Sequence, residues 1–479
     1  MSQFYRFFSI YSYNFIILFA LSVVFAACKT VEQPVEESTE DTDDKEVTEV
    51  DVSYGYDMMI SYFTSEVDQI QGKWLDEFQG REDFEKKLPV KRQQYADMIG
   101  LWPIPERTDL NPVVTGTIVR DGIEVRKLHF QSLPGLYVTA NLYLPEDRNE
   151  KLPGVLYLPG HTTIVEDGIS YGPKAADHYQ THPIWYAKNG IVSLIIDTLH
   201  GSEIQGIHRG THSHERWWWF NRGYTPAGVQ AWNAIRALDY LETLDEVDRE
   251  RLAVTGLSGG GADSWSLNAL DDRPVTVLAA AGITDLQNYI IDQRISNHCD
   301  CMFKVNRYRW DIPKIASLGI PRPVLLSNNT EDHHFPLDGV YRTDEQLSRL
   351  YHLAGKPENW DILIREGGHG DRPQRPDMYR FIHEKLTGEI LDEEAYEAAS
   401  PLFSREELLV FNGQLPVDER NTRIDEEFIR SAEIPSPADS RKTWIPMAER
   451  WKEQLSEYVF PGWPKEKDAL NLIMENEKS

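Results

Sequence analysis

One serine occurs in a sequence pattern typical of an activated nucleophile. Ser258 lies in Gly256-Leu257-Ser258-Gly259-Gly260, after the apolar run 252–255 and before the helical stretch 263–270. A nucleophile at a sharp strand-to-helix turn needs small neighbours, because the backbone passes close to itself there. The N-terminus of the following helix would favour negative charge that develops on the substrate. The pattern predicts that Ser258 attacks an acyl carbon.

A general base and an orienting carboxylate should follow Ser258 along the chain, each after a later strand. His369 lies in a glycine-flanked loop after the last apolar run, and Asp332 lies in the loop after the preceding run. His369 would accept the serine proton, and Asp332 would hold the imidazole in one tautomer and stabilise the imidazolium. We therefore predict a Ser258-His369-Asp332 triad.

Other carboxylates and histidines occur nearby, so position must decide between them. The alternative acids are Glu331 and Asp338, each of which could equally be a solvated loop carboxylate. Three other histidines either precede the final strand or lie on a helix: His333, His334 and His383.

Acyl transfer also needs hydrogen-bond donors for the oxyanion. The backbone N–H of Gly259, just after the nucleophile, is one candidate. The second should come from the loop Pro159-Gly160-His161-Thr162, which follows the apolar run 155–158. The sequence leaves open whether the N–H of His161 or that of Thr162 serves.

The elements that must position these groups change in character along the chain. A helical pattern over 54–101 precedes two alternating runs, 113–119 and 123–130, that flank Asp121-Gly122, a strong hairpin signal. A third strand is expected at 138–144. Short apolar runs without alternation then follow, separated by helical stretches such as 232–241; these runs are 155–158, 192–196, 252–255, 275–281, 324–327 and 362–364. Such runs predict an α/β fold, with a mostly parallel sheet covered by helices on both faces.

Two stretches resemble a known family. The helical run 224–241, followed by Val247-Asp248 and the serine turn, is similar to the acetyl xylan esterase and dienelactone-hydrolase-like branch of the α/β-hydrolases, as is 332–339. The resemblance covers about residues 110–390. It implies the α/β-hydrolase fold, a carbohydrate or related ester as substrate, and no metal or other cofactor.

The N-terminus indicates export. Arg6 precedes a short apolar run that ends in Val24-Phe25-Ala26-Ala27-Cys28, which resembles a bacterial lipobox, with Cys28 as the lipidated residue. The alternative is an ordinary signal peptide or anchor that contains a cysteine. We expect an outer-membrane lipoprotein, facing the periplasm or the cell surface, that contacts the membrane only through its lipid anchor.

These patterns divide the chain into five parts. Residues 29–52 are rich in Glu, Asp and Thr and should form a solvated tether. The parts are a signal peptide (1–27), an acidic disordered tether (28–52), a helical extension (53–110), the catalytic domain (111–390) and an irregular C-terminal extension packed on the body (391–479). The net charge of −28 argues against a nucleic-acid partner, which would require clustered Lys and Arg.

An insertion after the run 192–196 combines arginine and tryptophan. Arg209, Arg216 and Trp217 could bind a substrate, because Arg suits carboxylates or sulfates and Trp stacks on sugar rings. A packed insertion with core tryptophans and solvated charges explains the same residues. Both readings stay open at this point.

Three residues near position 300 could bind a metal. His298, Cys299 and Cys301 combine an imidazole with a Cys-x-Cys pair, but no second cysteine pair is present to complete a tetrahedral site. We expect a local disulfide or two buried thiols, and no metal.

The leading prediction is serine-dependent hydrolysis of a saccharide ester or oligosaccharide ester, in polysaccharide degradation. One alternative is a lyase or dehydratase that acts on uronate oligosaccharides, with His369 as the base and the arginine-rich insertion as its support. Another is a prolyl-oligopeptidase-like peptidase, although too few residues precede the catalytic strands for a propeller.

Overall fold

The computed structural model describes residues 53–206, 215–216, 218–430, 432–433 and 435–460. The predicted signal peptide, the tether and Cys28 lie outside the described residues. Contacts divide the chain into two units, Met1–Gly55 and Tyr56–Ser479. No helix in the described part of the chain is long and apolar enough to cross a bilayer.

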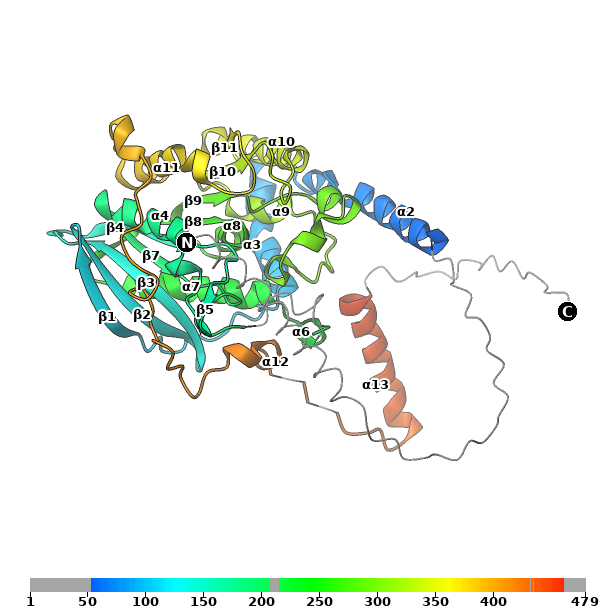
Figure 1. The fold of residues 1–479 in the computed structure, drawn as a ribbon. Helices are drawn as coiled ribbons and strands as arrows, with labels where there is room; N and C mark the ends of the chain where they lie inside the picture. Colours follow the sequence, from blue (N-terminus) through cyan, green and yellow to red (C-terminus); the bar gives the residue numbers. More distant parts are fainter. Residues whose placement is uncertain (1–52, 207–214, 217, 431, 434, 461–479) are drawn as a thin grey trace, which may run out of the picture. The chain divides into compact units, whose positions relative to one another are not determined.

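Helices and strands alternate from β7 (Val192–Ile196) to α11 (Arg375–Thr387), after an N-terminal pair of helices and a run of strands (Figure 1). The helices are α2 (Ser53–Ile70), α3 (Arg81–Met98), α4 (Asp177–Lys188), α6 (Trp218–Asn221), α7 (Pro226–Thr243), α8 (Gly259–Leu270), α9 (Pro313–Ala316), α10 (Leu337–Leu353), α11 (Arg375–Thr387), α12 (Ile424–Glu427) and α13 (Arg441–Gln454). The strands are β1 (Val113–Arg120), β2 (Ile123–Leu133), β3 (Leu136–Pro145), β4 (Leu152–Leu158), β5 (Val165–Glu166), β6 (Ile169–Ser170), β7 (Val192–Ile196), β8 (Val247–Leu257), β9 (Pro274–Ala280), β10 (Val324–Asn329) and β11 (Trp360–Arg365).

One large sheet organises the fold. Its strand order is β1-β2-β3-β7-β4-β8-β9-β10-β11. Antiparallel pairing joins β1 to β2, β2 to β3 and β3 to β7, and every pair from β7 to β11 is parallel. The antiparallel strands therefore form one side of the sheet and the βα repeats the other, which confirms the predicted α/β fold.

The predicted hairpin is present at the antiparallel edge. Val119 pairs with Glu124, and Arg120 pairs with Ile123. The two residues between the strands, Asp121 and Gly122, have φ angles of 50° and 75°. Positive φ at both central positions is the geometry that Asp-Gly favours, and its twist matches that of the flanking strands.

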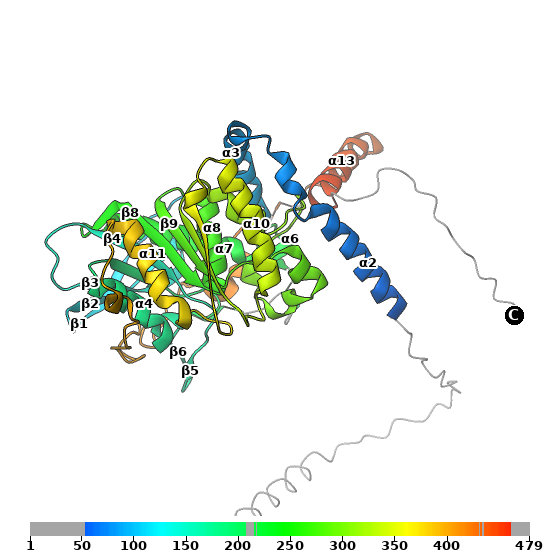
Figure 2. The same ribbon diagram turned by 90° about the horizontal axis from the view of Figure 1, so that it is seen from above.

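Both faces of the parallel part are buried, as the unalternating apolar runs predict. In β4, Leu156 and Leu158 pack in a core that includes side chains of α7, α8 and α10. Val155 and Tyr157 point to the opposite core, which includes side chains of α4 and α11. Figure 2 shows these two helical layers on either side of the sheet. Because both layers seal the sheet, polar chemistry is confined to the loops at the strand ends.

The helix α7 begins where the sequence indicates. Thr225 has extended backbone geometry, its hydroxyl accepts a hydrogen bond from the Gly228 N–H at 3.3 Å, and Pro226 follows at the first helical position. The Thr225 hydroxyl thus binds an N–H that has no partner within the helix, and the proline ring fixes φ near the helical value.

The segment after α11 contacts the α/β body through hydrogen bonds between side chains and backbone groups. The Gln180 Oε1 accepts hydrogen bonds from the N–H groups of Leu402 and Phe403, both at 3.1 Å. Asn421 pairs with the backbone of Tyr137 through both its amide oxygen and its amide nitrogen, at 2.9 and 2.8 Å. Further along, no side chain of α13 is buried.

Candidate active site

The turn between β8 and α8 holds Ser258 in a strained conformation. Its φ and ψ are 60° and −117°, a region that non-glycine residues rarely adopt. Its N–H donates to Ala280 O on the neighbouring strand, and its carbonyl accepts from Ala262 N on α8, both at 2.9 Å. These two bonds fix the sharp turn and leave the hydroxyl directed away from the sheet.

The small neighbours of Ser258 are required by close backbone approach. A Cβ at Gly256 would lie 2.4 Å from the Gly260 carbonyl oxygen, and one at Gly260 would lie 1.9 Å from the Leu158 carbonyl oxygen. Neither contact could be relieved by rotating a side chain. The glycines therefore let α8 begin directly at Gly259, four residues earlier than the sequence pattern suggested.

The structure brings the three predicted triad residues together. The His369 Nε2 lies 3.0 Å from Ser258 Oγ, and the His369 Nδ1 lies 2.9 Å from Asp332 Oδ2. The carboxylate is fully buried, whereas 28% of the His369 side chain is exposed. The base thus contacts the nucleophile through one ring nitrogen and the orienting carboxylate through the other, as nucleophilic catalysis by a triad requires.

The second oxygen of Asp332 fixes the carboxylate. Oδ1 accepts the N–H groups of His334 and Phe335 at 2.9 and 3.1 Å. The alternative acids lie elsewhere: Glu331 is exposed, and Asp338 forms an ion pair with Arg342 at 2.8 Å in the first turn of α10.

Two neighbours hold the loop that carries His369. Asn329, at the end of β10, donates from its amide nitrogen to the carbonyls of Gly368 and Gly370, at 2.6 and 2.9 Å. Asp371 pairs with Arg375 Nε at 3.0 Å and with His182 Nε2 at 3.0 Å. Burial alone would raise the pKa of Asp371, but His182 and Arg375 more than offset burial and hold the pKa well below its ordinary value. Asp371 is therefore a buried carboxylate that ties the loop to α4 and α11.

The predicted oxyanion donors lie beside Ser258. The backbone N–H of Gly259 is in the first turn of α8, where amide groups have no partner within the helix. In the facing loop, the Gly160 N–H donates to the Tyr179 hydroxyl at 2.8 Å, and the Thr162 N–H donates to the Gly160 carbonyl at 3.1 Å. The Thr162 N–H is therefore engaged within its own loop, and the N–H of His161 stays the predicted second donor.

A cavity of about 500 Å³ opens over Ser258 and His369. A neighbouring cavity of about 610 Å³ shares Thr162, His178, Arg372 and Arg375 with it. The Arg375 guanidinium is engaged by Asp371, by the Thr181 hydroxyl and by the His178 carbonyl. Arg372 is exposed and lines both cavities, so it offers a cation to a ligand.

Of the three residues of the insertion that were predicted to bind substrate, the structure describes Arg216. The Arg216 Nη2 lies 2.6 Å from Asp425 Oδ2, on α12, and Arg216 does not line the cavity over Ser258. Arg209 and Trp217 lie outside the described residues. Arg372 was not singled out from the sequence, although its place three residues after His369 in the chain could have suggested it.

The Cys-x-Cys pair consists of two free thiols, both buried, so no disulfide forms. The imidazole that meets them is that of His161, whose Nε2 lies 3.1 Å from Cys301 Sγ. His298 instead approaches the His334 carbonyl at 2.9 Å and stacks on Phe335. The sequence places His298 next to the pair, whereas the structure also brings in His161, which is 140 residues from Cys301 along the chain.

Comparisons with known proteins agree with this architecture. The acetyl xylan esterase family model matches residues 107–291. A Bacillus subtilis (strain 168) protein named as a hydrolase, YtaP, is 26% identical over 161 residues, which are 33% of this chain and 54% of that protein. The chain therefore spans about half the length of this curated relative.

Two solved structures share the fold. Methylesterase BT1017 superposes with a TM-score of 0.57 and 17% identity, over 83% of this chain and 81% of that one. A glucuronoyl esterase from Solibacter usitatus superposes with a TM-score of 0.51 and 17% identity, over 64% and 94% of the respective chains. At this level of identity the likeness shows the fold of the chain. Within it, residues 107–291 form the segment similar to acetyl xylan esterases.

Proposed function

We propose that this protein is a serine-dependent esterase that hydrolyses an ester carried by a carbohydrate. The observation that carries the proposal is the position of His369, whose two ring nitrogens lie 3.0 Å from Ser258 Oγ and 2.9 Å from Asp332 Oδ2. The family match and the names of the similar structures, a methylesterase and a glucuronoyl esterase, support the same reaction class.

The geometry supports a two-step acyl transfer. Ser258 Oγ attacks the ester carbon while its proton passes to His369 Nε2, and the N–H groups of Gly259 and His161 bind the oxyanion. His369 then donates this proton to the departing alkoxide, which leaves an acyl-serine. A water molecule, deprotonated by His369, attacks that ester and releases the acid and free Ser258. Asp332 stabilises the imidazolium throughout.

The substrate class follows from the cavity and the comparisons together. Thr162, His178 and Arg372 border both cavities, so a ligand longer than the ester group itself could extend from one to the other. The exposed Arg372 guanidinium suits a carboxylate or sulfate on a neighbouring sugar. We therefore expect an oligosaccharide ester, with an anionic group next to the reacting sugar.

The proposed location is outside the cytoplasm. The apolar run that ends in Ala26-Ala27-Cys28 supports export and lipidation of Cys28. The acidic residues 28–52 would then act as a tether between the lipid and the enzyme. We propose an outer-membrane lipoprotein that faces the periplasm or the cell surface.

The two alternatives have less support. Elimination on uronates rested on the arginine-rich insertion, where Arg216 is paired with Asp425. A prolyl-oligopeptidase-like peptidase has no support in the family match or in the two solved structures described above, whose names are those of esterases.

The test is hydrolysis of p-nitrophenyl acetate, of acetylated xylan oligosaccharides and of uronate methyl esters by the purified chain. Acid release should vanish in Ser258→Ala and persist in Ser264→Ala, which removes a buried hydroxyl one turn along α8. Full activity in Ser258→Ala, or an ultraviolet-absorbing double bond formed without acid release, would refute the esterase.

A further inference from the structure

A second cluster of reactive side chains lies beside the nucleophile turn. His161 belongs to the loop after β4, and Cys299 and Cys301 belong to a single turn between β9 and β10. One ligand atom from each of the three residues lies within 4.8 Å of the other two. Both thiols are at least 95% buried. None of the three side chains takes part in the proposed acyl transfer.

The turn presents its two sulfur atoms in a geometry that suits metal ligation. Cys299 precedes the one-turn helix Asp300–Met302, and its Sγ accepts the Cys301 N–H at 3.5 Å. An N–H directed at sulfur stabilises a thiolate and orients it, as outer-shell hydrogen bonds do around metal ligands. The Cys301 sulfur in turn lies 3.1 Å from His161 Nε2. Two sulfurs and one imidazole nitrogen therefore converge on one point.

Asp263 provides an independent sign that this region needs a cation. Its side chain is buried, and its Oδ2 accepts a hydrogen bond from the Gln230 amide. Its Oδ1 has no hydrogen-bond partner among the residues that the structure describes. The carboxyl group lies within electrostatic range of Cys299 and of the buried His200. A buried carboxylate oxygen without a partner is costly, unless a positive charge faces it.

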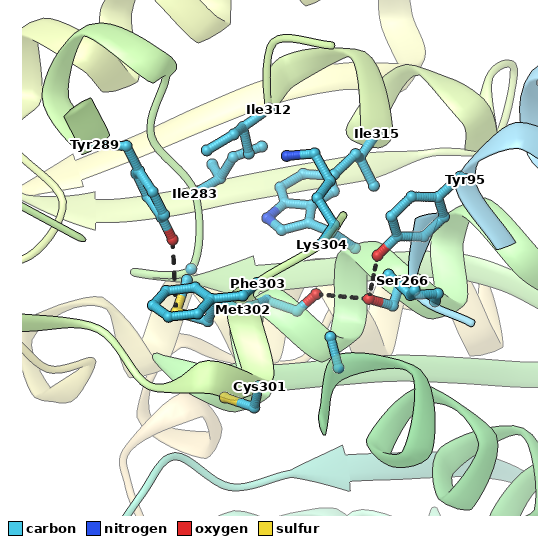
Figure 3. Close-up of a pocket in the computed structure, with 15 residues that line it drawn as sticks. Tyr95, Ser266, Ile283, Tyr289, Cys301, Met302, Phe303, Lys304, Ile312 and Ile315 are labelled. Atoms are coloured by element: carbon cyan, nitrogen blue, oxygen red, sulfur yellow. Dashed lines mark hydrogen bonds between the residues drawn. The ribbon is translucent and has the colours of Figure 1, made fainter. Parts of the chain in front are cut away.

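The donor set selects the class of ion. Thiolate sulfur and imidazole nitrogen are the ligands that Zn²⁺ and similar borderline or soft ions prefer, whereas Ca²⁺ and Mg²⁺ prefer oxygen. Three protein ligands leave one tetrahedral position for water or another group. Cys301 also lines an interior cavity of about 40 Å³, together with Tyr95, Ser266 and Lys304 (Figure 3). A molecule the size of water fits such a space.

We propose that His161, Cys299 and Cys301 bind a single zinc-class metal ion, beside the buried carboxyl group of Asp263. The ion would join the loop after β4 to the turn at 299–301, which are 140 residues apart in sequence. The site would thus act as a crosslink in the folded state, and its binding energy would add to the stability of the fold.

The crosslink would also affect catalysis. This part of the inference rests on the proposed function. The His161 ring packs against Gly259, where an added Cβ would lie 2.1 Å from its Cε1. The backbone N–H groups of these same two residues are the proposed oxyanion donors. A metal that fixes the His161 ring therefore fixes the distance between the two donors, and ester turnover should fall when the metal is removed.

The test uses the full chain with Cys28→Ser, so that every thiolate signal comes from Cys299 and Cys301. Reduced, chelator-treated protein is titrated with Co²⁺, which reports thiolate ligation through a charge-transfer band in the near ultraviolet. We expect one equivalent of Co²⁺ to bind, Zn²⁺ to displace it, and Zn²⁺ to raise the melting temperature. Cys301→Ser should lose the band and the thermal shift, whereas Met302→Leu, a sulfur-removing change in the same turn, should keep both.

Three results would overturn the proposal. They are an absence of stoichiometric Co²⁺ binding, a band that persists in Cys301→Ser, and a thiol titration of air-equilibrated protein that finds a disulfide in place of two free thiols. A Cys299→Ser variant that stays folded by circular dichroism separates loss of a ligand from loss of the fold. Fluorophosphonate labelling of Ser258 in the same samples keeps the two hypotheses apart: labelled protein without metal binding would refute the metal site and leave the esterase standing.

Discussion

Because the backbone of Ser258 is strained, Ser258→Ala and Ser258→Gly should lose activity equally but differ in stability. Both Ser258→Ala and Ser258→Gly remove the nucleophile and its hydrogen bond to His369, so those losses cancel between them. Alanine must still adopt φ 60° and ψ −117°, at a cost of about 1–3 kcal/mol. Glycine relieves that strain but loses about 0.4–1 kcal/mol through the greater entropy of its unfolded chain. The glycine variant should therefore be more stable than the alanine variant by about 1 kcal/mol.

Urea denaturation followed by circular dichroism and tryptophan fluorescence measures this difference. The two variants should unfold with the same slope and differ in midpoint, because a change in midpoint alone reports stability. Ser264→Gly and Ser264→Ala form the control pair on α8, where a helical residue should show the reverse order. If Ser258→Ala proved as stable as Ser258→Gly or more stable, the turn would not be strained. The inference that the fold stores strain at the nucleophile would then fail.

Three further expectations follow from the contacts around His369. Asp332→Asn should lower kcat by about 10⁴-fold, because it favours the wrong His369 tautomer. Ester hydrolysis by the folded variant measures this loss. A loss below tenfold would contradict the role of Asp332 in orienting His369. Arg372→Met should raise the KM for esters of anionic oligosaccharides and leave the KM for p-nitrophenyl acetate unchanged. The control is Arg349→Met, at an exposed position on α10. Equal losses on both substrates would argue that Arg372 does not recognise a charge. The depressed pKa of Asp371 means that its contribution to stability is present above its unfolded-state pKa of about 4 and is lost as the pH falls through the folded-state pKa. Asp371→Asn should cost about 3–5 kcal/mol at neutral pH, by leaving Arg375 buried without its carboxylate, and should flatten the acid limb of the stability profile. An unchanged acid limb in that variant would assign the titration to another group.

Much of the fold was accessible from local pattern. The Asp121-Gly122 turn specifies its hairpin through φ angles that only a few residue types adopt. The run at β7, Val192–Ile196, was predicted to the residue because both of its faces are buried and its ends are marked by turns. The start of α8 was placed too late, because glycines carry a low helix propensity and hide a helix that close backbone packing imposes.

The triad could be predicted because chain order and strand ends constrain it. Asp332 and His369 each follow a strand that the pattern of apolar runs predicts. Side-chain pairings between distant parts of the chain were not accessible in the same way. The pairing of Arg216 with Asp425 joins positions more than two hundred residues apart. The meeting of His161 with Cys301 depends likewise on how two distant loops pack, and no local periodicity encodes it.

The central claim is that Ser258 is a nucleophile activated by His369. The most direct measurement is labelling with a fluorophosphonate probe, followed by peptide mapping by mass spectrometry. We predict a single adduct on Ser258 in the wild-type chain, a much slower adduct in His369→Ala, and none in Ser258→Ala. An adduct on another residue, or an unlabelled protein that still hydrolyses esters, would contradict the account.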